Sequence, residues 1–337
     1  MLDIEKRLFE WSNSMLISSG RTKACEIKPL RQEASTRKYY RLISKDESHI
    51  GVFSSPTSEL NEQFIFLSEF FTKQGVAVPE VLFSDMENGW MLLEDFGDNS
   101  YQFKLNKKNF HHLFSAAFDE MISIHSCPLN SNIPFLEVDD LKNQMLLFEK
   151  WFLQGLLKIK LSREEDKLFS CLYKEILGDL TIQPYVLCHF DFESRNLMLL
   201  ENGNTGVLDF QDAVFGPIFL DPAALIKDLY LDLTEQEESN LFEEYITRAN
   251  ELPNVRLNIE DSKRSFDLTG LQRQLRILGV LSRLHLRDGK SFRLSDLNKT
   301  LNFVIETCNH YKELKEVSYY LKQKVVPLLA LTLKKIL

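Results

Sequence analysis

The stretch "VLCHFDFESRNLMLL", residues 186–200, is the most informative part of the sequence, because it places a polar loop between two apolar segments. The apolar ends predict two short buried strands. A carboxylate and an amide five residues apart in such a loop supply hard oxygen atoms, the ligands that Mg²⁺ prefers. The loop carries five polar or charged side chains of interest: His189, Asp191, Glu193, Arg195 and Asn196.

A second acidic position follows in "GVLDFQD", residues 206–212, where Asp209 ends another apolar segment thirteen residues after Asn196. Two strands joined by a turn at 201–205 would bring Asn196 and Asp209 close together and leave Asp191 at the start of the loop. One carboxylate would then orient a hydroxyl group, and two groups would hold a metal ion. The alternative is a polar β-turn loop whose acids cap backbone groups.

The motif "HFDFESRN", residues 189–196, keeps the H-x-D-x-x-x-x-N spacing of protein-kinase catalytic loops, and "DFQ" stands where kinases carry D-F-G. The chain therefore resembles the aminoglycoside phosphotransferase/choline kinase family, small-molecule kinases that share the protein-kinase fold. In that family a further Asp follows the metal-binding Asp after a Gly, and Gly216 and Asp221 match it. Asp221 before Pro222 also predicts the cap and first residue of a helix.

Longer segments resemble one subgroup of that family, the bacterial kinases that phosphorylate the anomeric hydroxyl of N-acetylmuramate and N-acetylglucosamine in cell-wall recycling. The resemblance covers about residues 30–300 and implies ATP and Mg²⁺ as cofactors. It also implies a sugar 1-phosphate product that passes to a uridylyltransferase. Two alternatives stay open: a kinase of another small hydroxyl substrate, such as an aminoglycoside or amino alcohol, and a non-catalytic nucleotide-binding protein. The segments are "EASTRKYYRL", "VPEVLFSD", "MLLEDFGDNSY", "SRNLM", "LDFQDAVFGP" and "GLQRQLRILGVLSRLHLRDGK".

The resemblance also implies a role for individual residues. His189 is expected to brace the loop by a hydrogen bond. Trp151 is either a platform for the sugar or a helix-packing residue. The expected site residues are Asp191 as catalytic residue; Asn196 and Asp209 as metal ligands; Ser35, Thr36, Arg37, Leu93, Glu94 and Phe96 as nucleotide contacts, with backbone groups of Glu94 and Phe96 on adenine; and Arg195, Asp212, Trp151 and Arg273 as acceptor contacts.

Two departures from protein kinases concern the phosphates of the nucleotide. The chain has no G-x-G-x-x-G, and "EASTRKYY", residues 33–40, stands in its place. No lysine occurs in "HIGVFSS", residues 49–55, where kinases carry the phosphate-pairing lysine; Phe53 or Ser54 occupies that position. Arg37 or Lys38 is the candidate for the missing charge, and both are equally compatible with solvated turn residues.

The pattern along the chain predicts an α+β, two-lobed, protein-kinase-like fold. A small sheet-rich amino-terminal lobe, 1–95, is expected before a large helical carboxy-terminal lobe, 96–337. Capping boxes at Ser162–Glu165 and Thr234–Glu237 mark two helix starts. The expected strands are 38–44, 49–55, 78–85 and 89–96, with one strand-like insert in the second half at 185–210. The expected helices are 61–75, 108–125, 222–231, 235–250, 267–287, 295–310 and 312–335.

Composition excludes some classes of protein. The 337 residues are 44% hydrophobic, which is enough for a large core, and carry a formal charge of −9 with no basic block. Coating of nucleic acid is therefore not expected. Five scattered cysteines form neither a zinc pattern nor a disulfide framework, so free buried thiols are expected. The amino terminus lacks a signal peptide and no apolar run reaches membrane length, which predicts a cytoplasmic protein with no membrane partner.

Overall fold

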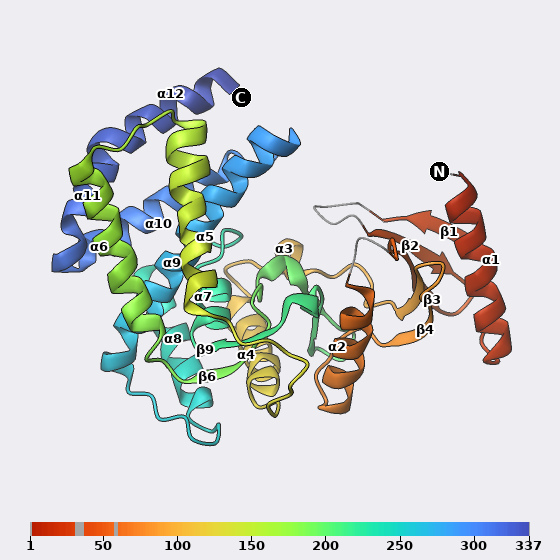
Figure 1. Ribbon diagram of the computed structural model, residues 1–337. Helices are drawn as coiled ribbons and strands as arrows, with labels where there is room; N and C mark the ends of the chain where they lie inside the picture. Colours follow the sequence, from red (N-terminus) through yellow and green to blue (C-terminus); the bar gives the residue numbers. More distant parts are fainter. Residues whose placement is uncertain (1, 31–36, 57–59, 337) are drawn as a thin grey trace. The chain divides into compact units, whose positions relative to one another are not determined.

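The computed structural model describes residues 2–30, 37–56 and 60–336 (Figure 1). The chain folds into two compact units. The first unit combines Met1–Leu105, His112–Cys127 and Arg195–Asp212. The second combines Asn106–His111, Pro128–Ser194 and Ala213–Leu337. The polar loop identified in the sequence is therefore shared, with Asp191 in the second unit and Asn196 in the first. The expected lobe boundary between residues 95 and 96 stays a prediction.

The first unit is built on a five-stranded antiparallel sheet of order β1-β2-β3-β5-β4. Four of these strands, and the helix expected at 61–75, are confirmed. Strand β1 was not predicted, because its four residues, "EIKP", lack apolar alternation and end in a proline that suits a sheet edge. The elements are α1 (Leu2–Ser18), β1 (Glu26–Pro29), β2 (Lys38–Ile43), β3 (Ser48–Phe53), α2 (Asn61–Lys73), β4 (Val81–Asp85) and β5 (Trp90–Glu94).

Helix α1, also not predicted, packs on the sheet beside β3 (Figure 1). Its residue Leu8 is fully buried and lies against Gly51 of β3. A Cβ at position 51 would meet the Leu42 side chain at 2.7 Å and the Leu8 side chain at 3.4 Å. The glycine therefore allows the helix to pack close to the strand.

A β-hairpin completes the first unit. It consists of β7 (Leu197–Leu199) and β8 (Thr205–Val207), flanked by the 3₁₀ turns η2 (Ser194–Asn196) and η3 (Phe210–Asp212). The N–H of Val207 donates to the carbonyl of Ala77, and the N–H of Leu199 donates to the carbonyl of Asn99, both at 2.8 Å. These bonds fix the hairpin against segments far earlier in the chain. The unit also contains α3 (Tyr101–Lys104) and most of α4 (Phe110–His125).

The second unit is mainly helical, with α9 packed against helices on several sides (Figure 1). Both predicted capping boxes are confirmed, at Ser162 and Thr234. Helix α9 begins at Ile259, eight residues before the expected start, because the Asn258 side chain accepts the N–H of Asp261 and caps it. The elements are α5 (Val138–Leu147), a π-helix η1 (Phe148–Leu156), α6 (Arg163–Leu180), α7 (Leu220–Ile226), α8 (Glu235–Ala249), α9 (Ile259–Asp288) and α10 (Asp296–His310).

Three further expectations need correction. The helix expected at 222–231 ends at Ile226, where the Lys227 backbone leaves the helical region. The helix expected at 312–335 is interrupted, because a 3₁₀ turn and a π-helical segment replace regular α-helix within it. A fourth strand in this half, β9 (Val214–Pro217), lies beyond the expected insert and pairs antiparallel with β6 (Tyr185–Cys188). The carboxy-terminal elements are η4 (Lys312–Leu314), α11 (Lys315–Tyr320), η5 (Leu321–Val325) and α12 (Val326–Ile336).

The five cysteines are free, as expected, although Cys25 and Cys171 are exposed rather than buried. Among the residues that the structure describes, no helix is both long enough and apolar enough to cross a bilayer.

Candidate active site

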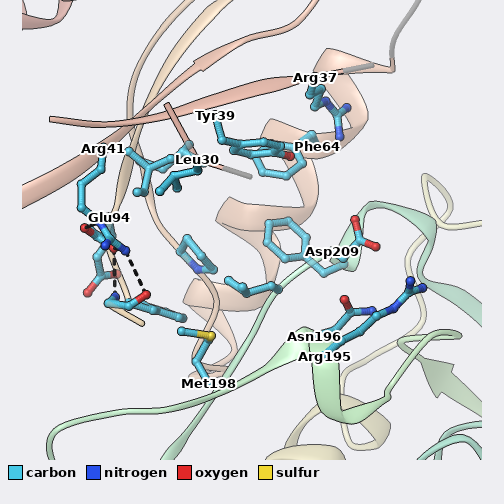
Figure 2. Close-up of a pocket in the computed structure, with 18 residues that line it drawn as sticks. Leu30, Arg37, Tyr39, Arg41, Phe64, Glu94, Arg195, Asn196, Met198 and Asp209 are labelled. Atoms are coloured by element: carbon cyan, nitrogen blue, oxygen red, sulfur yellow. Dashed lines mark hydrogen bonds and ion pairs between the residues drawn. The ribbon is translucent and has the colours of Figure 1, made fainter. Parts of the chain in front are cut away.

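The β7–β8 hairpin brings Asn196 and Asp209 together, as the sequence predicts. Leu208 donates its N–H to the carbonyl of Asn196 at 2.8 Å, which closes the ladder immediately beside both residues. Both side chains line one cavity of about 360 Å³ in the first unit (Figure 2). A cavity of this size lies within the range of small-molecule sites. Its apolar wall includes Leu30, Tyr39, Ile50, Leu93, Met198 and Phe210.

Two motif positions have unusual backbone conformations. Phe190 has φ = 77° and Asp209 has φ = 62°, and among the described residues only Lys158 and Asn254 are other non-glycine residues with positive φ. The left-handed region is unfavourable for a bulky residue such as Phe190, while aspartate tolerates it better. Strained backbone of this kind concentrates at functional sites and persists only where surrounding contacts hold it.

At Phe190 such contacts come from Asp221, which is fully buried in the second unit. Its carboxylate accepts the N–H of His189 at 2.7 Å and that of Phe190 at 2.8 Å. The expectation that Asp221 caps the helix before Pro222 is wrong, because α7 begins at Leu220 and its N-cap is Phe219. The acid is in the first turn, and its oxygens serve the loop, where two buried backbone donors need an acceptor.

The Asp191 carboxylate lies against two arginines of α9. Arg273 Nη1 donates to Asp191 Oδ1 at 3.1 Å, and Arg276 Nη1 donates to the same oxygen at 3.3 Å. Arg273 also donates to Glu193 Oε2 at 2.8 Å. Burial by itself lowers the pKa of Arg273, but the carboxylates of Glu193 and Asp191 outweigh it and raise that pKa above its ordinary value. Arg273 therefore stays charged beside Asp191.

A second carboxylate, that of Asp228 just after the end of α7, also supports the loop. Asp228 is buried, and its Oδ2 accepts the N–H of Ser194 at 2.8 Å. Burial, and then repulsion from Glu193, raises the pKa of Asp228 to about 6. The loop between β6 and η2 is thus held by Asp221 at its start and by Asp228 at its end.

Tyr39 and Arg41 of β2 line the cavity, and so does Arg37, the residue just before that strand; the three alternate along the chain as extended backbone requires. Arg37 is buried, its Nε donates to Ser54 Oγ at 3.3 Å, and its guanidinium lies 4.9 Å from the centre of the Phe64 ring. Ser54 is one of the two residues at the position of the missing strand lysine. A guanidinium therefore lies in the cavity beside that position. Lys38, the other candidate, points to the opposite face of the strand by the same alternation.

The predicted adenine-binding residues Leu93, Glu94 and Phe96 also line the cavity. The N–H of Glu94 donates to the carbonyl of Glu80 at 3.0 Å. A base that bonds the Glu94 backbone would therefore have to donate to its carbonyl oxygen. Phe96 packs against Gly206 of the hairpin, where an added Cβ would meet the Phe96 ring at 2.6 Å.

The remaining predicted residues lie in different places. Arg195 lines the cavity, and Asp212 is exposed at the end of η3. Trp151 is half-buried in the π-helix of the second unit, with Lys150 Nζ 5.6 Å from its ring centre. Ser35 and Thr36 lie outside the described residues.

Three residues that contact the predicted site residues or their loop, or that line the cavity with them, were not predicted from the sequence. Arg41 is detectable in principle, since it follows Arg37 and Tyr39 on one strand face. Arg276 lies one helical turn after Arg273, and that spacing places both on the same face of α9. Asp228 has no sequence signal, because its role depends on contacts with a loop more than thirty residues earlier.

Comparison with known proteins gives the same picture. A family model described as "Phosphotransferase enzyme family" (APH) matches residues 26–257. A curated protein of Pseudomonas aeruginosa named N-acetylmuramate/N-acetylglucosamine kinase is 31% identical over 302 residues, covering 88% of each chain. A protein of the same name from Pseudomonas putida is 28% identical over 300 residues, again covering 88% of each chain.

Solved structures show the same fold at low sequence identity. Choline kinase LicA from Streptococcus pneumoniae superposes with a TM-score of 0.61 at 15% identity, covering 88% of this chain and 99% of that chain. The ADP-bound aminoglycoside phosphotransferase APH(2'')-Ib gives a TM-score of 0.61 at 15% identity, covering 89% of this chain and 98% of that chain. These similarities confirm the predicted kinase-like α+β fold.

Proposed function

The chain belongs to the phosphotransferase enzyme family, and from this premise we propose that it transfers the γ-phosphoryl group of ATP to the C1 hydroxyl of N-acetylmuramate or N-acetylglucosamine. The observation that carries the proposal is the convergence of Asn196 and Asp209 on one cavity with the residues expected to bind adenine. The sugar is supported by the names of the curated relatives, which match most of the chain.

The cavity suits a nucleotide. Apolar residues form walls for a flat base, and the proposal assigns the exocyclic amine of that base to the carbonyl of Glu94. Arg37, buried beside Ser54, supplies positive charge for the phosphates in place of the strand lysine. The missing lysine therefore does not leave the nucleotide without a cation.

Asn196 and Asp209 fit a magnesium ion by the chemistry of their donors. Both supply hard oxygen atoms to the same cavity, and the exposed Asp209 carboxylate retains acceptor capacity although its Oδ1 accepts from Gln211 Nε2 at 2.7 Å. When bound, Mg²⁺ neutralises phosphate charge during transfer. The left-handed backbone at Asp209 determines where that carboxylate is held.

In the proposed reaction, Asp191 accepts a hydrogen bond from the C1 hydroxyl and orients that oxygen for in-line attack. The bond from O1 to the γ-phosphorus forms while the bond from that phosphorus to the β,γ-bridging oxygen breaks. The electron pair of the broken bond leaves with ADP, and the proton of the C1 hydroxyl passes to Asp191 and then to solvent. Positioning contributes most of the acceleration, because the transition state of phosphoryl transfer is loose.

The proposal extends to the remaining predicted positions. Arg195, Asp212 and Trp151 are candidate acceptor contacts, and Ser35 and Thr36 are candidate phosphate contacts. The lobe boundary at residues 95 and 96 belongs to the same proposal. The sugar 1-phosphate product has the chemistry that a uridylyltransferase consumes, so we place such an enzyme next in the reaction sequence.

The deciding experiment is a panel of acceptors with ATP and Mg²⁺, with the phosphorylated position read by phosphorus NMR. We expect phosphate on C1 of the N-acetylated sugars and little reaction with glucose, because a site built for the acetamido group leaves its own polar groups unpaired without it. Phosphate on C6 would contradict the anomeric assignment. Turnover of kanamycin or choline but not of sugars would favour the other small-molecule kinases, and ATP binding without any turnover would favour a non-catalytic protein.

A further inference from the structure

The second unit presents one arginine beside Asp191 that the loop does not bury. Arg276 donates to Asp191 Oδ1 at 3.3 Å, and its guanidinium lies 4.8 Å from the centre of the Phe190 ring. Its side chain is 22% exposed, against 9% for Arg273. Toward the described residues, Arg276 uses one of its five N–H donors, that of Nη1 to Asp191, so the planar group keeps donors for a ligand.

Arg273 differs in what holds it. It donates to Asp191, to Glu193 Oε2 at 2.8 Å and, more weakly, to the carbonyl of Phe190 at 3.5 Å. The Arg273 guanidinium neutralises the carboxylates of the loop, and a substitution that removed it would leave the buried Glu193 without this cation. Arg276 instead rests on an aromatic face with one long hydrogen bond, an arrangement that permits it to move without unpairing a buried acid.

The charge around Asp191 matters for the acceptor. A hydroxyl group that binds Asp191 brings its sugar ring within the reach of the neighbouring guanidinium. If that sugar carries a carboxylate, as N-acetylmuramate does on its lactyl ether, two negative groups lie a few ångströms apart and repel each other. A guanidinium between them offsets the repulsion and matches a carboxylate with two parallel hydrogen bonds.

We propose that Arg276 is the residue that recognises the carboxylate of an anionic acceptor sugar, using donors that Asp191 does not occupy. This inference rests on the proposed function and deepens it, since it assigns the distinction between the anionic and the neutral sugar to one side chain. A neutral acceptor such as N-acetylglucosamine has no partner for Arg276 and needs only Asp191.

The test compares Arg276→Gln with the unchanged protein on both sugars. We expect kcat/KM for N-acetylmuramate to fall at least ~10-fold, the scale of a lost hydrogen bond to a charged group, mainly through KM. For N-acetylglucosamine we expect a clearly smaller loss, because that sugar offers Arg276 no carboxylate and the variant removes only the long hydrogen bond to Asp191, which acts on both sugars. Arg287→Gln is the matched control, because Arg287 lies on the same helix, is largely exposed and pairs with Asp288.

A second probe does not depend on how the variant folds. With the unchanged protein, converting the lactyl carboxylate of N-acetylmuramate to its carboxamide should lower kcat/KM at least ~10-fold. Arg276→Gln should then treat the acid and the amide alike, which is the coupling that a double-mutant cycle detects. Arg276→Lys, which keeps the charge without the planar fork, should lose part of the preference for the acid.

The outcomes separate the two proposals. Phosphorylation of both sugars by the unchanged protein, with a selective loss for the anionic one in Arg276→Gln, supports the role of Arg276. Equal losses on both sugars in Arg276→Gln overturn the role of Arg276, because the residue would then act through Asp191. Equal activity of the unchanged protein on N-acetylmuramate and on its carboxamide overturns that role as well. If the unchanged protein phosphorylates neither sugar, the proposed function fails first and this inference with it.

Discussion

Arg41 Nε lies 2.6 Å from Asp95 Oδ2, an ion pair that ties the centre of β2 to the segment after β5. The same guanidinium donates to both oxygens of Asp98 at 2.7 Å and to the carbonyl of Gly97 at 3.0 Å. Asp95 is buried, with a side chain 2% exposed, whereas that of Asp98 is 79% exposed. Because Asp95 lies between Glu94 and Phe96, this pair fixes the backbone proposed to bind adenine.

The two carboxylates provide a matched pair of variants. Asp95→Ala should lower the free energy of unfolding by ~3 kcal/mol, because it leaves the partly buried Arg41 without its buried partner. Asp98→Ala should cost less than ~1 kcal/mol, as exposed ion pairs do. Denaturant titration measures both. Asp95→Ala should also raise KM for ATP with little change in kcat, and equal effects of the two variants would argue against a role for this pair in the nucleotide site.

Asp209→Asn tests the metal site without adding backbone strain, since asparagine accepts a positive φ as readily as aspartate. Loss of the carboxylate should lower kcat/KM at least ~100-fold, the scale of a lost electrostatic contact in a transition state. The measurement is turnover over a Mg²⁺ titration. Glu201→Gln, an exposed change in the turn of the same hairpin, is the control. Normal turnover of Asp209→Asn at low Mg²⁺ would remove Asp209 from the site.

Asp191→Asn should separate binding from transfer. Asparagine is nearly isosteric but cannot accept the proton of the acceptor, so the rate should fall ~100-fold or more. ATP affinity by calorimetry should stay unchanged, because the cavity proposed to bind the nucleotide lies in the first unit and Asp191 in the second. A parallel loss of affinity and rate would make Asp191 a structural residue of the loop.

Asp228 predicts a dependence of stability on pH. Its pKa in the folded protein is raised from 3.8 to about 6, so between these values the folded state holds a proton that the unfolded state has lost. The contribution of this group to stability therefore falls as pH rises from 4 to 6, by on the order of 2–3 kcal/mol. Asp228→Asn, which cannot ionise, should lose this dependence.

The measurement for Asp228 is the melting temperature of both proteins at pH 5 and pH 8. The difference between Asp228→Asn and the unchanged protein should grow in favour of the variant by about 2 °C between these pH values. Other titrating groups are common to both proteins and cancel in the difference. A gap that is constant with pH, or that moves the other way, would contradict a raised pKa at Asp228.

Much of the fold was predictable from local signals. Three signals depend on neighbours nearby in the chain. They are the strand-like segments of β2 and β3, the capping boxes at Ser162 and Thr234, and the spacing from Asp191 through Asn196 to Asp209. Such signals act through backbone geometry and short-range hydrogen bonds, so they can be read in one dimension. The short strand β1 and the early start of α9 were missed, because an edge strand and a single Asn cap carry little pattern.

The local sequence pattern was enough to select the groups of the proposed site: the acids and amide of the kinase-like motif, and the apolar segments that frame them. The contacts that hold those groups, and the cations that face them, could be found only in the folded structure. Asp221 was expected to cap its own helix and instead binds the backbone of a distant loop, and Arg276 meets Asp191 from a helix far along the chain. The physical reason is that buried carboxylates and backbone donors must find partners in three dimensions, and chain folding rather than sequence spacing selects those partners.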